Sequence, residues 1–321
     1  METTSTSLDS QRIVSLLPSA TEILCALGLE GSIIAVTHEC DHPAGIEKLP
    51  HITSSRLDGS TMSCAEIDHA VRSQLQGHGS IYNLDEKLLE ELKPDLIVTQ
   101  ELCEVCAVNY QMVKASARTF AADARILSLE PMDIAGILEN IQTVGEFCDV
   151  PGRATEVVAE LTERVELLRS GAAGKTKRPG VFMLEWLDPP FSPGHWVPEQ
   201  VELAGGYPLL GKNGQKSVVT TYEAIAESNP EFLMLIPCGF SVAEIKQRIV
   251  DTELPRFMET VDAVRNDNIW ALNASAYFSR PGPRVVDGAE ILKEILDNGQ
   301  DARLDSNTAL NVSAEFKASL K

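Results

Sequence analysis

Short apolar runs alternate with helical patterns in both halves of the chain, and this alternation limits the fold more than any other feature. The runs predicted as strands are Arg12–Leu17, Ile33–Thr37, Asp95–Thr99, Arg125–Leu129, Gly180–Leu184, Glu231–Ile236 and Ile269–Leu272. Helical patterns between them are Cys64–Leu75, Asp85–Leu92, Met132–Cys148, Val197–Ala204, Tyr222–Ser228, Val242–Val250 and Pro283–Asn298. Such alternation predicts an α/β fold with parallel sheets and helical crossovers.

The longest helical pattern, residues 151–171, separates the two halves. Pro151 suits the first position of a helix, and apolar residues then recur at helical spacing as far as Leu168. We therefore predict two Rossmann-like lobes, 12–150 and 172–298, joined by this one long helix. Residues 1–11 are predicted to be disordered and residues 299–321 to form a flexible tail.

The charge of the chain excludes some partners. The formal net charge is −20 and the pI about 4.7, which disfavours binding to nucleic acid or to an anionic membrane. No apolar run approaches the ~20 residues that span a bilayer. The polar residues 1–11 show no export signal, and the 7 cysteines are an odd number. These features predict a cytoplasmic protein without a disulfide framework.

Ligands of α/β proteins bind beyond the carboxyl ends of the strands, and several chemically distinctive residues follow predicted strands. His38 and Cys40 follow one strand, and the C-x-x-C pair Cys103 and Cys106 follows another. Together they predict a site for a zinc or iron ion, which His195 could complete. The alternatives are a redox dithiol or reduced cysteines without a ligand.

A third such stretch, residues 185–196, is aromatic. Trp186, Phe191 and Trp196 lie close together in a chain with 5% aromatic residues. Aromatic faces suit flat organic ligands, so this stretch, with His195, is a candidate binding wall. An opposite wall is predicted from Tyr277, Phe278 and Arg280, whose guanidinium could neutralise a carboxylate or phosphate. Packing between lobes is the alternative, particularly for Trp186.

Several segments resemble the helical-backbone metal-receptor superfamily, and within it the vitamin B12-binding proteins of ABC importers. They are RIVSLLPSATE (12–22), LKPDLIV (92–98), PPF (189–191), ELAGG (202–206) and YFSRPGPR (277–284). The resemblance implies a class III periplasmic-binding-protein fold, two lobes on one helix with a metal chelate held between them. Glu202 matches a permease-docking position, whereas the N-lobe position falls near Lys87, with Glu86 and Glu90 beside it. That mismatch, like the missing export signal, counts against docking to an importer.

No G-x-S-x-G, Walker A or H-E-x-x-H motif occurs, and Glu22 is expected to form a capping box with Ser19 rather than a catalytic site. The leading hypothesis is a cytosolic, non-enzymatic binder of a corrinoid such as cobalamin or of a related chelate. The alternatives are a metallochaperone or sensor that uses the cysteine site, and an enzyme acting on a chelate or thiol substrate.

Overall fold

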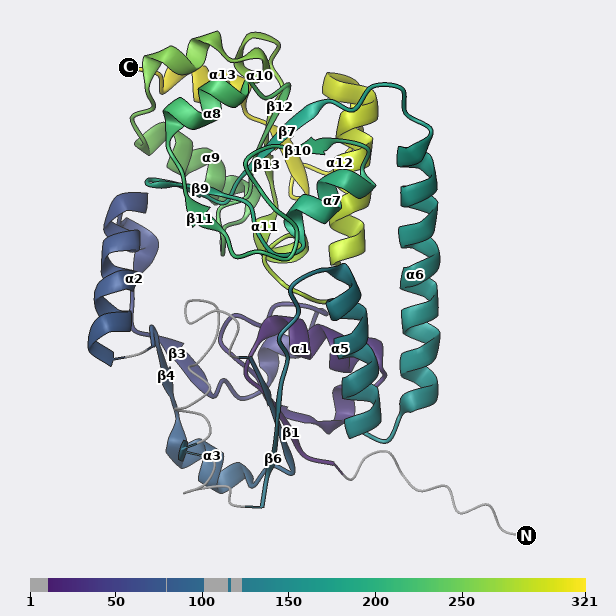
Figure 1. The fold of residues 1–321 in the computed structure, drawn as a ribbon. Helices are drawn as coiled ribbons and strands as arrows, with labels where there is room; N and C mark the ends of the chain where they lie inside the picture. Colours follow the sequence, from purple (N-terminus) through teal and green to yellow (C-terminus); the bar gives the residue numbers. More distant parts are fainter. Residues whose placement is uncertain (1–10, 79, 101–114, 117–122) are drawn as a thin grey trace. The chain divides into compact units, whose positions relative to one another are not determined.

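The computed structural model describes residues 11–78, 80–100, 115–116 and 123–321 (Figure 1). The predicted disorder of residues 1–11 falls almost wholly outside them. The chain forms two compact units. Unit 1 lies within Met1–Asp58, His69–Glu130 and Leu138–Val158; unit 2 comprises Gly59–Asp68, Pro131–Ile137 and Ala159–Lys321.

Unit 1 is built on a four-stranded parallel sheet in the order β2-β1-β5-β6. The strands are β1 (Ile13–Ser15), β2 (Ile33–Ala35), β5 (Leu96–Thr99) and β6 (Arg125–Ser128), and all four were predicted. An antiparallel hairpin of β3 (Thr53–Ser55) and β4 (Tyr82–Leu84) was not. The helices are α1 (Pro18–Ala26), α2 (Cys64–His78) and α3 (Glu86–Leu92), of which α2 continues from unit 2.

The start of α1 differs from the predicted capping box. The helix begins at Pro18, and its N-cap residue, Leu17, makes no side-chain cap hydrogen bond. Proline suits the first helical position because its ring fixes φ and its missing N–H would have no intrahelical partner there. Ser19 and Glu22 therefore lie inside the helix, where both are buried, and the predicted box is wrong.

Unit 2 is built on a mostly parallel sheet in the order β10-β7-β12-β13-β14, in which only β14 is antiparallel. Side chains alternate across it. Phe182, Leu184 and Leu233 pack with α8 and α9 on one face, while Val181 faces α7 and α12 on the other. The strands are β7 (Gly180–Leu184), β10 (Tyr207–Pro208), β12 (Phe232–Leu235), β13 (Ile269–Leu272) and β14 (Ala309–Asn311).

Helices and a small antiparallel sheet complete unit 2. The helices are α7 (Val197–Leu203), α8 (Tyr222–Ser228), α9 (Val242–Asp251), α10 (Asp262–Arg265), α11 (Ala274–Tyr277), α12 (Val285–Asn298) and α13 (Ser313–Ala318). The small sheet has the order β11-β9-β8, with β8 (Trp186–Leu187), β9 (Pro190–Ser192) and β11 (Val218–Val219). It follows β7 directly and so sits at the carboxyl end of the main sheet.

The predicted connecting helix is confirmed as α6 (Pro151–Ala173), which belongs to unit 1 as far as Val158 and to unit 2 from Ala159. It follows α5 (Ile134–Phe147) after a tight turn. Gly145 is required there, because a Cβ at that position would lie 2.3 Å from Cβ of Ala154. No helix in the described part of the chain combines the length and apolar character needed to cross a membrane.

The predicted flexible tail, residues 299–321, is wrong. β14 pairs with β13, Leu254 bridges to Leu320, and α13 buries Phe316 completely. Val312 joins the same apolar cluster as Phe182. Spaced apolar residues in a polar segment were enough to dock it on the sheet, because each reaches a buried position.

Phe316→Ala is therefore expected to lower the free energy of unfolding by about 3–5 kcal/mol, the range for a deleted buried aromatic ring. Phe257→Ala is the matched control, since Phe257 is 39% exposed, and it should cost less than about 1 kcal/mol. Urea unfolding measures both. Equal, small effects would show that the C-terminal segment lies outside the core.

Candidate ligand-binding site

Three loops of unit 2 emerge at one edge, because β7, β12 and β13 are parallel and their carboxyl ends coincide. They follow Leu184, Leu235 and Leu272. The first and third carry all the predicted aromatic ligand residues. We name residues Tyr277–Val285 of the third loop, which lead from α11 into α12, the Tyr277–Val285 loop.

Trp196 and Phe278 are anchors of this edge. Trp196 is 6% exposed and Phe278 2% exposed, so both rings are buried. Trp196 Nε1 donates a hydrogen bond to the carbonyl of Phe278 at 2.9 Å. In this conformation neither ring offers a face to a ligand, and the two hold α7 to the Tyr277–Val285 loop.

Tyr277, Arg280 and Arg284 are half-buried on the same loop. The guanidinium carbon of Arg284 lies 5.7 Å from the centroid of the Tyr277 ring, a cation–π distance. Arg280 stands between them in sequence. An aromatic ring and two guanidinium groups are thus presented by one short loop, and that chemistry suits an organic ligand bearing an anionic group.

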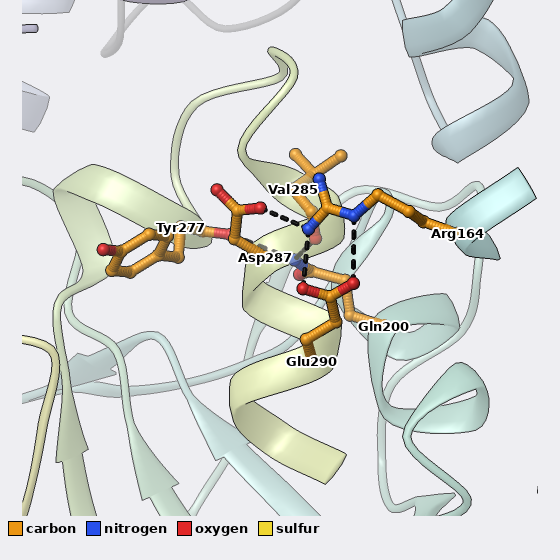
Figure 2. Close-up of polar contacts among 6 residues, drawn as sticks. All are labelled: Arg164, Gln200, Tyr277, Val285, Asp287 and Glu290. Atoms are coloured by element: carbon orange, nitrogen blue, oxygen red, sulfur yellow. Dashed lines mark hydrogen bonds and ion pairs between the residues drawn. The ribbon is translucent and has the colours of Figure 1, made fainter. Parts of the chain in front are cut away.

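The start of α12, directly after this loop, is fixed by Arg164 of α6 (Figure 2). Arg164 Nη2 donates to Asp287 at 2.5 Å and to Glu290 at 2.6 Å, while Nε donates to Glu290 at 3.0 Å. These hydrogen bonds raise the pKa of the guanidinium further above its usual value. Fork-like bonding of this kind is geometrically specific.

Trp186 has a structural environment as well. Its ring stacks on Phe240 with centroids 5.4 Å apart, and its Nε1 donates to the carbonyls of Cys64 and Asp188. Arg248 lies over the other aromatic ring, 5.2 Å from the Phe240 centroid, and donates to the carbonyls of Gly59 and Met62. These contacts bind the Gly59–Asp68 segment into unit 2. Phe191, half-buried on β9, pairs with Trp186 and Val219.

His195, two residues before α7, has an unusual backbone conformation and an unpaired ring nitrogen. Its φ is +52°, and its Nε2 is buried without a hydrogen-bond partner. Burial, and secondarily Lys216, lowers the pKa of the imidazole below its ordinary value. His195 is therefore held in its neutral form near pH 7.

Only two of the predicted metal ligands of unit 1, His38 and Cys40, are among the residues that the structure describes. Cys103 and Cys106 lie outside the described residues. Cys40 is buried, with Sγ 3.2 Å from Thr21 Oγ1 and 3.7 Å from Thr37 Oγ1. His38 Nδ1 lies 2.8 Å from Thr53 Oγ1. Burial lowers the pKa of His38, with Glu39 opposing the shift. Among the residues the structure does describe, no cluster of three or more His, Cys, Asp or Glu could hold a metal ion.

The predicted docking residue Glu202 is exposed on α7. Lys87, near which the N-lobe docking position was predicted, pairs with Glu91 at 3.9 Å. The sequence missed Gln200, Phe240 and Arg248, which fix the loops described above. A signal for Gln200 existed, because it is a polar residue within the apolar stripe of α7.

The model of a family described as "Periplasmic binding protein" matches residues 13–276, most of the chain. The chain belongs to this family. A vitamin B12-binding protein of Vibrio cholerae is 24% identical over 291 residues, covering 88% of this chain and 87% of the relative. One from Yersinia pestis is 23% identical over 286 residues, with 88% and 85% covered.

Solved structures of the periplasmic-binding-protein kind share the fold. The periplasmic vitamin B12-binding protein of Vibrio cholerae superposes with a TM-score of 0.65 at 22% identity, over 90% of this chain and 98% of that one. A periplasmic heme-binding protein from Pseudomonas aeruginosa gives 0.68 at 19%, over 93% and 96%. The predicted class III fold of two lobes on a long helix is confirmed. A family of binding proteins also agrees with the expectation that the chain is not an enzyme.

The predicted cytoplasmic location is contradicted by the same comparisons. The family description and the names of both neighbours are those of periplasmic proteins. The prediction relied on polar leading residues and on the number of cysteines, and neither determines the compartment in which a binding fold of this kind works.

The lowered pKa of His195 predicts a pH dependence of stability. The unfolded chain takes up a proton near the ordinary value of 6.5, whereas the folded chain takes it up only at lower pH. Stability is therefore fully present above about pH 7 and falls as pH drops through 6.5 towards the folded-state pKa. The slope from one proton is at most about 1.4 kcal/mol per pH unit.

His195→Asn should flatten this slope between pH 7 and 5, because asparagine does not titrate and tolerates a positive φ. Urea unfolding at several pH values measures it, and His69→Asn, at an exposed histidine of α2, is the matched control. An unchanged slope in His195→Asn would contradict the assignment.

Proposed function

We propose that this chain is a solute-binding protein for a corrinoid of the cobalamin type. The observation that carries the proposal is the match to vitamin B12-binding proteins, which runs along 88% of this chain and 87% of the relative. The site supports it through its chemistry. Tyr277 supplies an aromatic face, and Arg280 and Arg284 supply cations from the same loop at the carboxyl edge of unit 2.

Fewer residues are proposed to contact the ligand than the sequence predicted. Tyr277 and Arg280 are assigned to the ligand together with Arg284, because all three are partly exposed on the Tyr277–Val285 loop. Trp196 and Phe278 are assigned to the frame behind them, because their rings are buried. Phe191 and His195 are secondary contacts on the first loop.

Titration calorimetry with cyanocobalamin tests the proposal, with hemin as the comparator. We expect one molecule of cyanocobalamin per chain, bound more tightly than hemin. Tyr277→Ala should raise Kd about tenfold, equivalent to about 1.4 kcal/mol, because it removes the aromatic face and the contact with Arg284.

Tyr207→Ala is the matched control, since Tyr207 is an exposed tyrosine of the same unit, and its Kd should be unchanged. Tighter binding of hemin would assign the site to haem instead, and binding of neither compound would refute a tetrapyrrole-like ligand.

A further inference from the structure

Gln200 connects α7 to both ends of the Tyr277–Val285 loop. Its side-chain Nε2 donates to the carbonyl of Tyr277 at 3.0 Å and to the carbonyl of Val285 at 2.7 Å. Figure 2 shows the amide reaching the two ends of the loop from α7. The residue is completely buried. Because both partners are carbonyl oxygens, the amide can only present its NH₂ group to them.

Trp196, one helical turn before Gln200, adds a third hydrogen bond to the same loop. Its Nε1 donates to the carbonyl of Phe278. Residues four apart lie on the same face of a helix, so the two donors act from one side. All three bonds end on backbone atoms. The frame therefore sets the path of the loop whatever its side chains bind.

The amide of Gln200 achieves this at an energetic cost. Its Oε1 is buried and has no hydrogen-bond partner. A buried acceptor without a partner is destabilising, and a methionine or leucine would fill an ordinary packing position without that cost. A glutamine at position 200 is explained if holding the two ends of the Tyr277–Val285 loop together matters more than the folding stability that an apolar residue would give.

Gly288 of α12 leaves the space that this arrangement needs. A Cβ there would lie 2.5 Å from Gln200 Nε2 and 2.6 Å from the carbonyl oxygen of Tyr277. Any side chain at 288 would therefore press directly on the hydrogen bond between them.

We propose that Gln200 and Trp196 are positioning residues that hold the Tyr277–Val285 loop in its ligand-binding conformation, with Gly288 providing the space for them. The inference rests on the proposed function, because the loop is the one assigned to the corrinoid. It predicts that affinity depends on residues that never touch the ligand.

Gln200→Met removes the donor at nearly constant volume. We expect amide exchange within residues 278–286 of the ligand-free protein to accelerate at least tenfold, and Kd for cyanocobalamin to rise about tenfold. Trp196→Phe, which keeps a ring and loses the N–H, should give a smaller change of the same kind. Gln247→Met is the control, because Gln247 is exposed on α9 and bonds to Asp251.

Gly288→Ala gives an independent test. Alanine normally stabilises a helix interior relative to glycine, but here it should lower the melting temperature and accelerate the same loop exchange. The inference is overturned if Gln200→Met lowers only the melting temperature, with loop exchange and Kd within twofold of the control.

Failure of the proposed function is distinguishable from failure of this inference. If the wild-type chain binds neither cyanocobalamin nor hemin, the proposed ligand is wrong. Loop exchange in the ligand-free variants then decides the positioning role by itself. Faster exchange in Gln200→Met supports it, and unchanged exchange overturns it.

Discussion

Both faces of β7, β12 and β13 are buried, and this burial decides where unit 2 can place polar chemistry. Almost every residue of these strands is apolar, so functional groups are confined to the loops at the carboxyl edge. Such loops lack the ladder hydrogen bonds that hold the strands. Side chains hold them instead. Gln200 and Trp196 donate to backbone carbonyls of the Tyr277–Val285 loop, and Trp186 and Tyr222 donate to the carbonyls of Asp188 and Leu187 in the loop after β7.

Holding a loop by buried side-chain hydrogen bonds can leave other polar atoms of the same side chain unpaired. When a side chain donates to a backbone carbonyl, its other polar atoms still need hydrogen-bond partners. Oε1 of Gln200 has none. Nε2 of His195, two residues before the same helix, is also buried and unpaired. Each such atom costs about 1–3 kcal/mol. Two of these atoms therefore lie in or next to α7, beside the loops that Gln200 and Trp196 contact.

The sequence predicted the central strands β1, β2, β5, β6, β7, β12 and β13 and the helix α6 because their signals are local. A buried strand is a short apolar run, and α6 keeps one apolar stripe through Leu161 and Val165. The binding site was harder to predict than the strands, because the sequence shows where an aromatic residue lies but not which way its ring points. Trp196 was predicted to contact a ligand, and Trp186 was predicted to do so or to be structural. In the structure each donates its N–H to a backbone carbonyl. The partners of Gln200 lie 77 and 85 residues away, so no local pattern could identify them.

The contacts of Gln200 and Trp196 with the Tyr277–Val285 loop end on its backbone and not on its side chains. A frame that grips only backbone carbonyls constrains the path of the loop, while its exposed side chains can change with the ligand. In this chain the loop carries Tyr277, Arg280 and Arg284 and no acidic residue, although the net charge is −20. Asp287 and Glu290, the first acidic residues after the loop, are both bonded to Arg164. The loop segment itself therefore carries two basic and no acidic side chains within an acidic chain.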